Sequence, residues 1–194
     1  YGVILLQTAV KLKIIAISML IAASLAYAVY SSDWFQKKYL YPFPYQGIVY
    51  KYALEYNIDP FLVAGVIRAE SKFIPQARSP RGALGLMQIM PDTAKWIAAQ
   101  TDQNDFSMEQ LTDPEINIRF GTWYLSSLQE EFGNNEILIL AAYNGGRGNV
   151  QQWMQQNAWP ENFDQIERIP FEETREYVTR VLHNKRRYQE LYGR

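Results

Sequence analysis

The sequence contains no cysteine among its 194 residues. This absence excludes disulfide bonds, thiolate metal sites and a lipid anchor attached through cysteine. Histidine is almost as scarce, since His183 is the only one and has no other metal-binding side chain beside it. We therefore expect His183 to be a surface residue of a helix, and we expect the protein to use no metal and no cofactor.

An excess of positive charge is also missing. The formal net charge is −1, and the residues after the first thirty carry 17 basic and 20 acidic side chains. A protein that binds nucleic acid normally presents a basic surface to the phosphate backbone. We therefore expect no nucleic-acid partner.

The alternation of polar and apolar residues that is typical of β-strands is hard to find. Helical periodicity recurs instead, and the Asp-Pro pairs at 59–60 and 113–114 are helix-start signals. A chain of this length supports one core of ordinary size. We expect a nearly all-α domain over residues 46–194, with helices at 46–56, 60–70, 92–100, 114–132, 135–144, 148–157 and 171–191.

The only long apolar run lies near the N-terminus. Residues 14–30 are uncharged and mainly apolar, and they follow Lys11 and Lys13. This pattern is typical of a membrane-insertion signal whose start lies in the cytoplasm. The chain begins with Tyr1 and not with Met, so we expect further residues upstream.

Two outcomes are compatible with this segment. Residues 1–30 can remain as a single-pass anchor in the cytoplasmic membrane, or a signal peptidase can cut near Ala28, after the small-x-small pattern 26–28. We favour the anchor because Trp34 and Phe35 extend the interfacial character past the cut. Residues 31–45 then form a juxtamembrane linker, and the helical domain lies outside the membrane, facing the cell wall.

Glu70 is a carboxylate on the apolar face of a predicted helix. Glu70 ends the predicted helix 60–70, and Val63, Val66 and Ile67 precede it by one or two turns on the same face. Desolvation in such a wall raises a carboxyl pKa and keeps the group protonated near neutral pH, as the general acid of glycosidic bond cleavage requires. The alternative is an ordinary glutamate at a helix end that turns into water.

Two later segments combine glycines with isolated polar side chains. In the run 85–91, Gln88 is a lone amide among apolar residues, and nearby backbone could satisfy it as well as a ligand could. The run 142–145 places Tyr143 and Asn144 at the end of another predicted helix. By itself it is an ordinary helix stop at glycine.

Together these segments resemble the catalytic domain of the soluble lytic transglycosylases, goose-lysozyme-like enzymes of family 1 that cleave murein. The resemblance covers roughly residues 45–192 and implies an all-α, lysozyme-like fold with a substrate groove. Four motifs carry it in order: Glu70-Ser71, the block from Gly85 to Pro91, Ala142-Tyr143-Asn144, and the segment from Ile169 to Val178.

The resemblance implies a lyase that acts on peptidoglycan glycan strands. Glu70 would protonate the glycosidic oxygen of the β-1,4 bond between N-acetylmuramic acid and N-acetylglucosamine. It would then accept the proton of the muramoyl C6 hydroxyl, which attacks the anomeric carbon and leaves a 1,6-anhydromuramoyl end. We expect a monomer.

The resemblance also implies roles for other residues around the groove. Tyr143 would hydrogen-bond Glu70, and Asn144 would hold the sugar chain. Met90 could instead pack in the core, and Glu173 could be a carboxylate favoured at a helix start. The remaining expected contacts are Gln88 and Met90 in the saccharide subsites, and Ser79 and Glu173 with acetamido or peptide groups at the groove wall.

Three further predictions concern the tryptophans and the alternative functions. Trp96, Trp123 and Trp153 fall on predicted helices, so we expect them in the core and not in sugar stacking. A lysozyme-type hydrolase on the same fold would recruit Asp92 or Asp102 to activate water. A glycan-binding module without catalysis would keep the groove without needing Glu70.

Overall fold

The structure is a computed structural model that describes residues 2–103 and 105–193. Tyr1 and Arg194, the outermost residues of the predicted anchor and domain, therefore lie outside the described residues. The chain divides into two compact units, residues 1–42 and 43–194.

The N-terminal unit consists mainly of one long helix. Helix α1 runs from Gly2 to Ser31, and its part from Val10 to Ser31 is long and apolar enough to cross a membrane. Part of the expected linker 31–45 is helical, as α2 (Asp33–Phe35) and the π-helix η1 (Gln36–Leu40). The side-chain amide of Gln36 donates to the Tyr30 carbonyl at 2.8 Å, which ties η1 to the end of α1.

The second unit confirms the expected all-α fold, and all of the predicted helices are present. No strand occurs among the described residues. Leu84 only forms isolated bridges with Arg78 and Ile89. In chain order the elements are α3 (Gln46–Glu55), α4 (Pro60–Ser71), α5 (Pro91–Gln100), η2 (Met108–Thr112), α6 (Pro114–Phe132), α7 (Glu136–Gly145), α8 (Arg147–Asn157), η3 (Ile166–Arg168) and α9 (Glu172–Tyr192).

Side-chain caps explain why the helices begin where the sequence predicts. The Asp59 carboxylate accepts from the Phe61 amide at 2.8 Å, and proline follows as the first residue of α4. Asp113 caps α6 in the same way, and Asn135 caps α7. Each cap satisfies amides that the first helical turn leaves unpaired.

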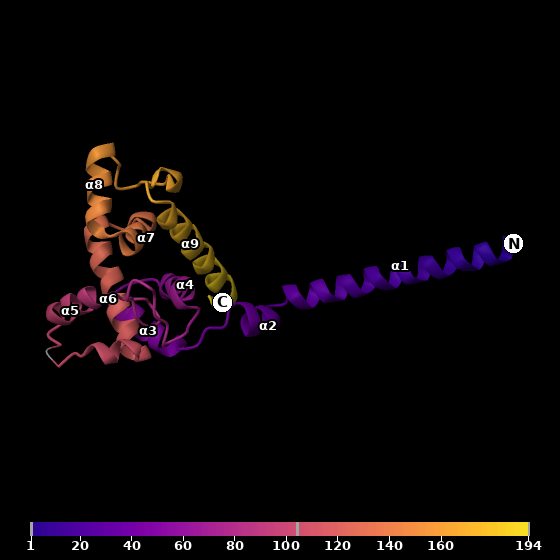
Figure 1. Ribbon diagram of the computed structural model, residues 1–194, viewed down its shortest axis with the longest axis horizontal. Coiled ribbons are helices and arrows are strands. Elements are labelled where there is room, and N and C mark those ends of the chain that lie inside the picture. Colours follow the sequence, from indigo (N-terminus) through magenta and orange to yellow (C-terminus); the bar gives the residue numbers. More distant parts are fainter. Residues whose placement is uncertain (1, 104, 194) are drawn as a thin grey trace. The chain divides into compact units, whose positions relative to one another are not determined.

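Helices α4 and α9 pack closely, and α7 contacts α9, α8 and α6 (Figure 1). A Cβ atom on Gly65 of α4 would lie 2.9 Å from the Val181 carbonyl of α9, so only glycine permits this approach. The Lys185 ammonium of α9 is paired with Asp59 at 2.9 Å and with Glu136. This cation therefore links α9 to the starts of α4 and α7.

Asn117 of α6 is fully buried, and its side chain holds the loop between α4 and α5 in place. Its side-chain amide donates to the carbonyls of Leu84 at 3.0 Å and Leu111 at 2.8 Å, while its oxygen accepts from the Met87 amide at 2.7 Å. Gly85 has a φ of +80° and leaves the space that this amide fills. A Cβ there would lie 2.1 Å from the Asn117 nitrogen.

We predict that Gly85→Ala lowers the free energy of unfolding by about 3 kcal/mol or more, because the methyl group strains the backbone and also displaces the Asn117 amide. Gly82→Ala is the matched control. Gly82 has a φ of +90°, but no atom lies within 4 Å of the position that an added Cβ would take. This variant should lose only about 1 kcal/mol. Denaturant unfolding measures both, and equal losses would contradict the proposed role of Asn117.

Candidate active site

All of the site residues that the sequence predicts line one cleft, which has a volume of about 390 Å³. It lies where the end of α4, the loop before α5, the end of α7 and the start of α9 meet. The lining residues are Glu70 from α4, Ser79, Pro80, Arg81, Ala83, Gln88 and Met90 from the loop, Tyr143 and Asn144 from α7, and Glu173 from α9.

Glu70 is half-buried at the end of an apolar wall. Val63, Val66 and Ile67 are fully buried on the same helix. Burial raises the pKa of Glu70 to about 7. The Tyr177 hydroxyl and the positive charge of Arg180 oppose this shift, and the negative charge of Glu173 adds to it. Near neutral pH the carboxyl group can therefore both give and accept a proton.

Tyr177 of α9 is the phenol that acts on Glu70, and the sequence did not single it out. Its hydroxyl is buried and forms no hydrogen bond of normal geometry among the described residues. It nevertheless lies close enough to the Glu70 carboxyl to lower that group's pKa. A buried hydroxyl without a partner favours the ionised carboxylate once Glu70 has lost its proton.

The expected hydrogen bond from Tyr143 to Glu70 is absent. The Tyr143 hydroxyl donates instead to the Met87 carbonyl at 2.8 Å. The reason is the course of the loop, which turns at residues 85–88 and brings this carbonyl to the end of α7. Tyr143 therefore ties the loop to α7 and lines the cleft with its ring, while Tyr177 takes the place beside Glu70.

Hydrogen bonds fix the two amides of the cleft. The Thr174 hydroxyl donates to the Asn144 oxygen at 2.8 Å, which leaves the Asn144 nitrogen as a donor. The Gln88 nitrogen donates to the carbonyls of Ala77 at 3.1 Å and Gly85 at 2.8 Å. Backbone thus satisfies the donors of Gln88, as the alternative interpretation held, although the side chain also lines the cleft. Its oxygen remains as an acceptor.

Charged and polar groups of the loop and of α9 meet at the cleft wall. The Ser79 hydroxyl accepts from the Ala83 amide at 2.9 Å and holds the turn of the loop. Arg81 reaches Glu173 with a separation of 3.4 Å. Both side chains are largely exposed, so this ion pair contributes little to stability and can open to admit a ligand.

Comparison with known proteins identifies the domain. Residues 47–166 match the family described as "Transglycosylase SLT domain". The chain belongs to this family. The match spans the helices from α3 to α8 and includes every cleft residue except Glu173.

Two kinds of curated relative resemble this SLT domain. The "Soluble lytic murein transglycosylase" of Salmonella typhimurium is 37% identical over 162 residues, which are 82% of this chain and 25% of that protein. The "Membrane-bound lytic murein transglycosylase C" of Sodalis glossinidius is 34% identical over 122 residues, 55% of this chain and 32% of that protein. The chain spans about a quarter of the length of the soluble relatives that it matches.

Solved structures show the same fold. The 70 kDa soluble lytic transglycosylase of Escherichia coli superposes with a TM-score of 0.76 at 38% identity, over 82% of this chain and 26% of that one. An inactive glutamate-to-glutamine mutant of the lytic transglycosylase Slt from Pseudomonas aeruginosa gives a TM-score of 0.72 at 35% identity, over 81% and 26% of the two chains. The SLT domain of this chain is therefore lysozyme-like in fold, as the resemblance implies.

The predictions about the packing of four residues in the SLT domain have mixed outcomes. Met90 is 42% exposed and lines the cleft, so the alternative that Met90 packs in the core is wrong. Trp153 is buried as expected and Trp123 is half-buried. Trp96 is 36% exposed, which contradicts the core prediction. Its ring lies at the edge of the domain, 5.3 Å from the ring of Trp123 and with the Arg147 guanidinium 5.7 Å from its centre.

The residues that the hydrolase alternative would recruit do not line the cleft of the SLT domain. Asp92 and Asp102 are both exposed, and neither is among the lining residues. The second carboxylate that does line it is Glu173. Among the described residues, no group of three or more histidine, cysteine, aspartate or glutamate side chains could hold a metal ion.

We predict that Glu70→Gln stabilises the protein at high pH. The folded-state pKa of Glu70, about 7, lies above its ordinary value of 4.5, so stability falls as pH rises between these values. An amide at this position cannot ionise. At pH 8.5 the variant should exceed the wild type by on the order of 2 kcal/mol, and near pH 4.5 the difference should vanish.

Unfolding curves measured from pH 4.5 to 8.5 test this linkage. Glu176→Gln is the matched control, since it removes an exposed carboxylate of α9 that does not act on Glu70, and its difference should lack the rise expected for Glu70→Gln. A Glu70→Gln difference that does not grow with pH would show that Glu70 ionises as easily in the folded state as in the unfolded one.

Proposed function

We propose that the chain is a membrane-anchored lytic transglycosylase. It cleaves the β-1,4 bond between N-acetylmuramic acid and N-acetylglucosamine in peptidoglycan and forms 1,6-anhydromuramoyl ends. The observation that carries the proposal is Glu70, whose pKa burial raises to about 7 inside a cleft with polar groups on its walls. Membership of the SLT family and the names of its relatives support the same activity.

The reaction needs one group that gives a proton and then takes one back. Protonated Glu70 donates to the glycosidic oxygen as the bond to the anomeric carbon breaks. The resulting carboxylate, stabilised by the Tyr177 hydroxyl and by Arg180, accepts the proton of the muramoyl C6 hydroxyl. That oxygen forms the new bond to the anomeric carbon. Because the nucleophile is part of the reacting sugar, it has a high effective concentration, and no bound water is required.

The walls of the cleft supply contacts that hold the glycan strand. Asn144 offers its nitrogen and Gln88 its oxygen, because hydrogen bonds within the protein use their other atoms. Met90 offers an exposed apolar surface. One chain provides all of the lining residues, so we propose that the protein acts as a monomer.

Hydrolysis by the same cleft is the second candidate, and Glu173 is the observation that favours it. A hydrolase needs a second carboxylate to position water or to act as a nucleophile. Glu173 is present in the cleft, but it is exposed and paired with Arg81 at 3.4 Å. We favour the intramolecular reaction, because Glu70 alone can perform it, whereas hydrolysis would also require Glu173 to leave Arg81.

The end of α1 supports the membrane part of the proposal. Tyr30, Trp34 and Tyr39 gather where the apolar helix ends, and the Lys38 ammonium lies 5.1 Å from the Trp34 ring and 5.4 Å from the Tyr39 ring. Aromatic and basic side chains of this kind are enriched at membrane interfaces. We propose that α1 anchors the protein in the cytoplasmic membrane by a single pass, with the SLT domain facing the cell wall.

We predict that digestion of peptidoglycan in water labelled with ¹⁸O yields muramoyl ends that lack both the label and a reducing terminus. They should be lighter by one water than the products of hydrolysis, which mass spectrometry of the released muropeptides measures. Glu70→Gln should reduce turnover on the order of a hundredfold or more. Glu173→Gln should leave the anhydro product unchanged. Label in most of the product would assign the cleft to a hydrolase.

We predict that the native protein stays with membranes through washing at high salt, because salt does not screen the burial of apolar side chains. Immunodetection of the washed membrane and soluble fractions measures this. The control is a chain without residues 10–31, which should move to the soluble fraction. A mature N-terminus at Val29 would instead establish secretion after cleavage.

A further inference from the structure

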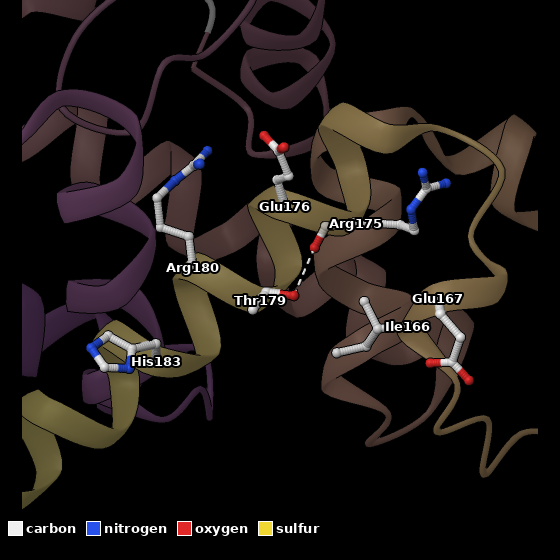
Figure 2. Close-up of a pocket in the computed structure, with 7 residues that line it drawn as sticks. All are labelled: Ile166, Glu167, Arg175, Glu176, Thr179, Arg180 and His183. Carbon is white, nitrogen blue, oxygen red and sulfur yellow. Dashed lines mark hydrogen bonds between the residues drawn. The ribbon is translucent and has the colours of Figure 1, made fainter.

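A cavity of about 740 Å³ lies along α9 beside η3 (Figure 2). Its lining is mainly charged, and among the described residues no tryptophan, tyrosine or phenylalanine contributes to it. The Thr179 hydroxyl, a neutral polar group of this cavity, already donates to the Arg175 carbonyl at 2.9 Å. The cavity therefore offers no ring on which a sugar could stack. A second pocket, between α3 and α6, differs in both respects.

This second pocket has a volume of about 390 Å³ and lies between the end of α3 and the second half of α6. We call it the α3–α6 pocket. It shares no lining residue with the catalytic cleft. Two aromatic residues, two carboxylates, two amides and two hydroxyls line it: Trp123 and Tyr56, Glu55 and Glu130, Asn57 and Gln129, and Ser126 and Ser127.

Contacts within the domain hold both aromatic rings of the pocket in place. The Tyr56 ring stacks on that of Tyr52, with 6.2 Å between the ring centres and 12° between the planes. The Tyr56 hydroxyl accepts from the Arg119 guanidinium at 3.3 Å. The Trp123 ring lies 5.3 Å from the ring of Trp96. A ligand would therefore meet rings that are already positioned, which lowers the entropic cost of binding.

Half of the polar side chains in the pocket are left for a ligand. Those that form no hydrogen bond or ion pair with any described residue are Asn57, Ser126, Gln129 and Glu130. Amides and hydroxyls both donate and accept, so they match the hydroxyl and acetamido groups of a sugar. The Arg119 guanidinium offsets the charge of Glu55, and this pocket therefore fits a sugar better than a cation.

Helix α6 separates the pocket from the catalytic cleft. Trp123 lines the pocket, whereas the next residue, Tyr124, has its ring 5.4 Å from the ring of Tyr143, which lines the cleft. Successive residues of a helix point about 100° apart, because about 3.6 of them complete a turn. A ligand in the pocket would therefore lie on another side of α6 from a strand bound at Glu70.

We propose that the α3–α6 pocket binds an N-acetylated sugar of a second glycan strand, an inference that takes the kind of sugar from the proposed function. The apolar C–H face of the sugar ring would stack on Trp123. Asn57 and Gln129 would pair with its acetamido group, and Ser126 and Glu130 with its hydroxyls. The pocket would hold the protein on the cell wall while the cleft acts on another strand, which raises the effective concentration of substrate at Glu70.

The Trp123 indole gives a direct test of binding. The chain has five tryptophans, and comparison with Trp123→Phe assigns the indole N–H signal of Trp123 in an NMR spectrum of the full chain. The protein is held in a detergent whose headgroup is not a sugar, so that the detergent does not compete. The probe is a tetramer of N-acetylglucosamine. Its titration should shift the Trp123 signal to saturation, and no shift up to about 10 mM tetramer would overturn the proposal.

Variants separate the pocket from the cleft, which can bind the same tetramer. Gln129→Ala removes an amide from the pocket and keeps Trp123 as the reporter, so it should weaken the reported binding roughly tenfold. Glu130→Ala should weaken it in the same direction. Gln155→Ala is the matched control, because Gln155 is an exposed amide of α8 outside the pocket. Unchanged affinity in both pocket variants would show that the shift arises from the cleft and would overturn the proposal.

A kinetic test compares insoluble peptidoglycan sacculi with short soluble glycan strands. Gln129→Ala should release anhydromuramoyl ends from sacculi roughly threefold more slowly, or slower still, and should keep the wild-type kcat/KM on soluble strands. An equal loss on both substrates, or no loss on sacculi, would overturn the binding of a second strand. Absence of anhydromuramoyl product from both substrates with the wild type would instead overturn the proposed function, while the titration tests the pocket without turnover.

Discussion

The close packing of α4 against α9 is the constraint on which the rest of the domain depends. It requires glycine at position 65, because any side chain there would meet the Val181 carbonyl. Lys185 adds an ionic link from α9 to Asp59 and Glu136, which lie at the starts of α4 and α7. This packing also sets the positions of the side chains in the cleft. Glu70 at the end of α4 comes to lie beside Tyr177 of α9, and both helices run continuously from this packing contact to the site.

The same packing makes the Glu70 carboxyl energetically costly to ionise. Glu70 continues an apolar stripe, and its burial is the largest cause of its raised pKa. Tyr177 and Arg180 limit the shift, which keeps the pKa near 7, where both protonation states are accessible. A stronger desolvation would leave a good acid that could not release its proton, and a weaker one would leave a carboxylate with no proton to give. The site thus balances burial against two partners from α9.

Local signals explain what the sequence predicts well. Capping residues and helical periodicity define the helix limits, and Glu70 stands out because it interrupts an apolar stripe. Tyr177 and Thr174 act through partners far away in the sequence, as Asn117 does through Leu84 and Met87, and nothing in their own surroundings marks them. Trp96 shows the opposite failure. Its place on a helix was predictable, but how much of its ring the side chains of α6 and α8 leave exposed was not.

Helix α9 carries two surfaces with different chemistry. Its inner face supplies Thr174 and Tyr177, which act on Asn144 and Glu70 together with the charge of Arg180, while Glu176 and Thr179 lie exposed on its outer face. A rigid helix fixes the separation of groups on its two faces, since each turn advances by about 5.4 Å. The proposed reaction needs such a fixed separation, because the carboxyl of Glu70 and the amide of Asn144 must meet one glycan strand at the same time. A flexible loop in the place of α9 could carry the same side chains, but it would not keep Tyr177 beside Glu70 and Thr174 on Asn144 at the same time.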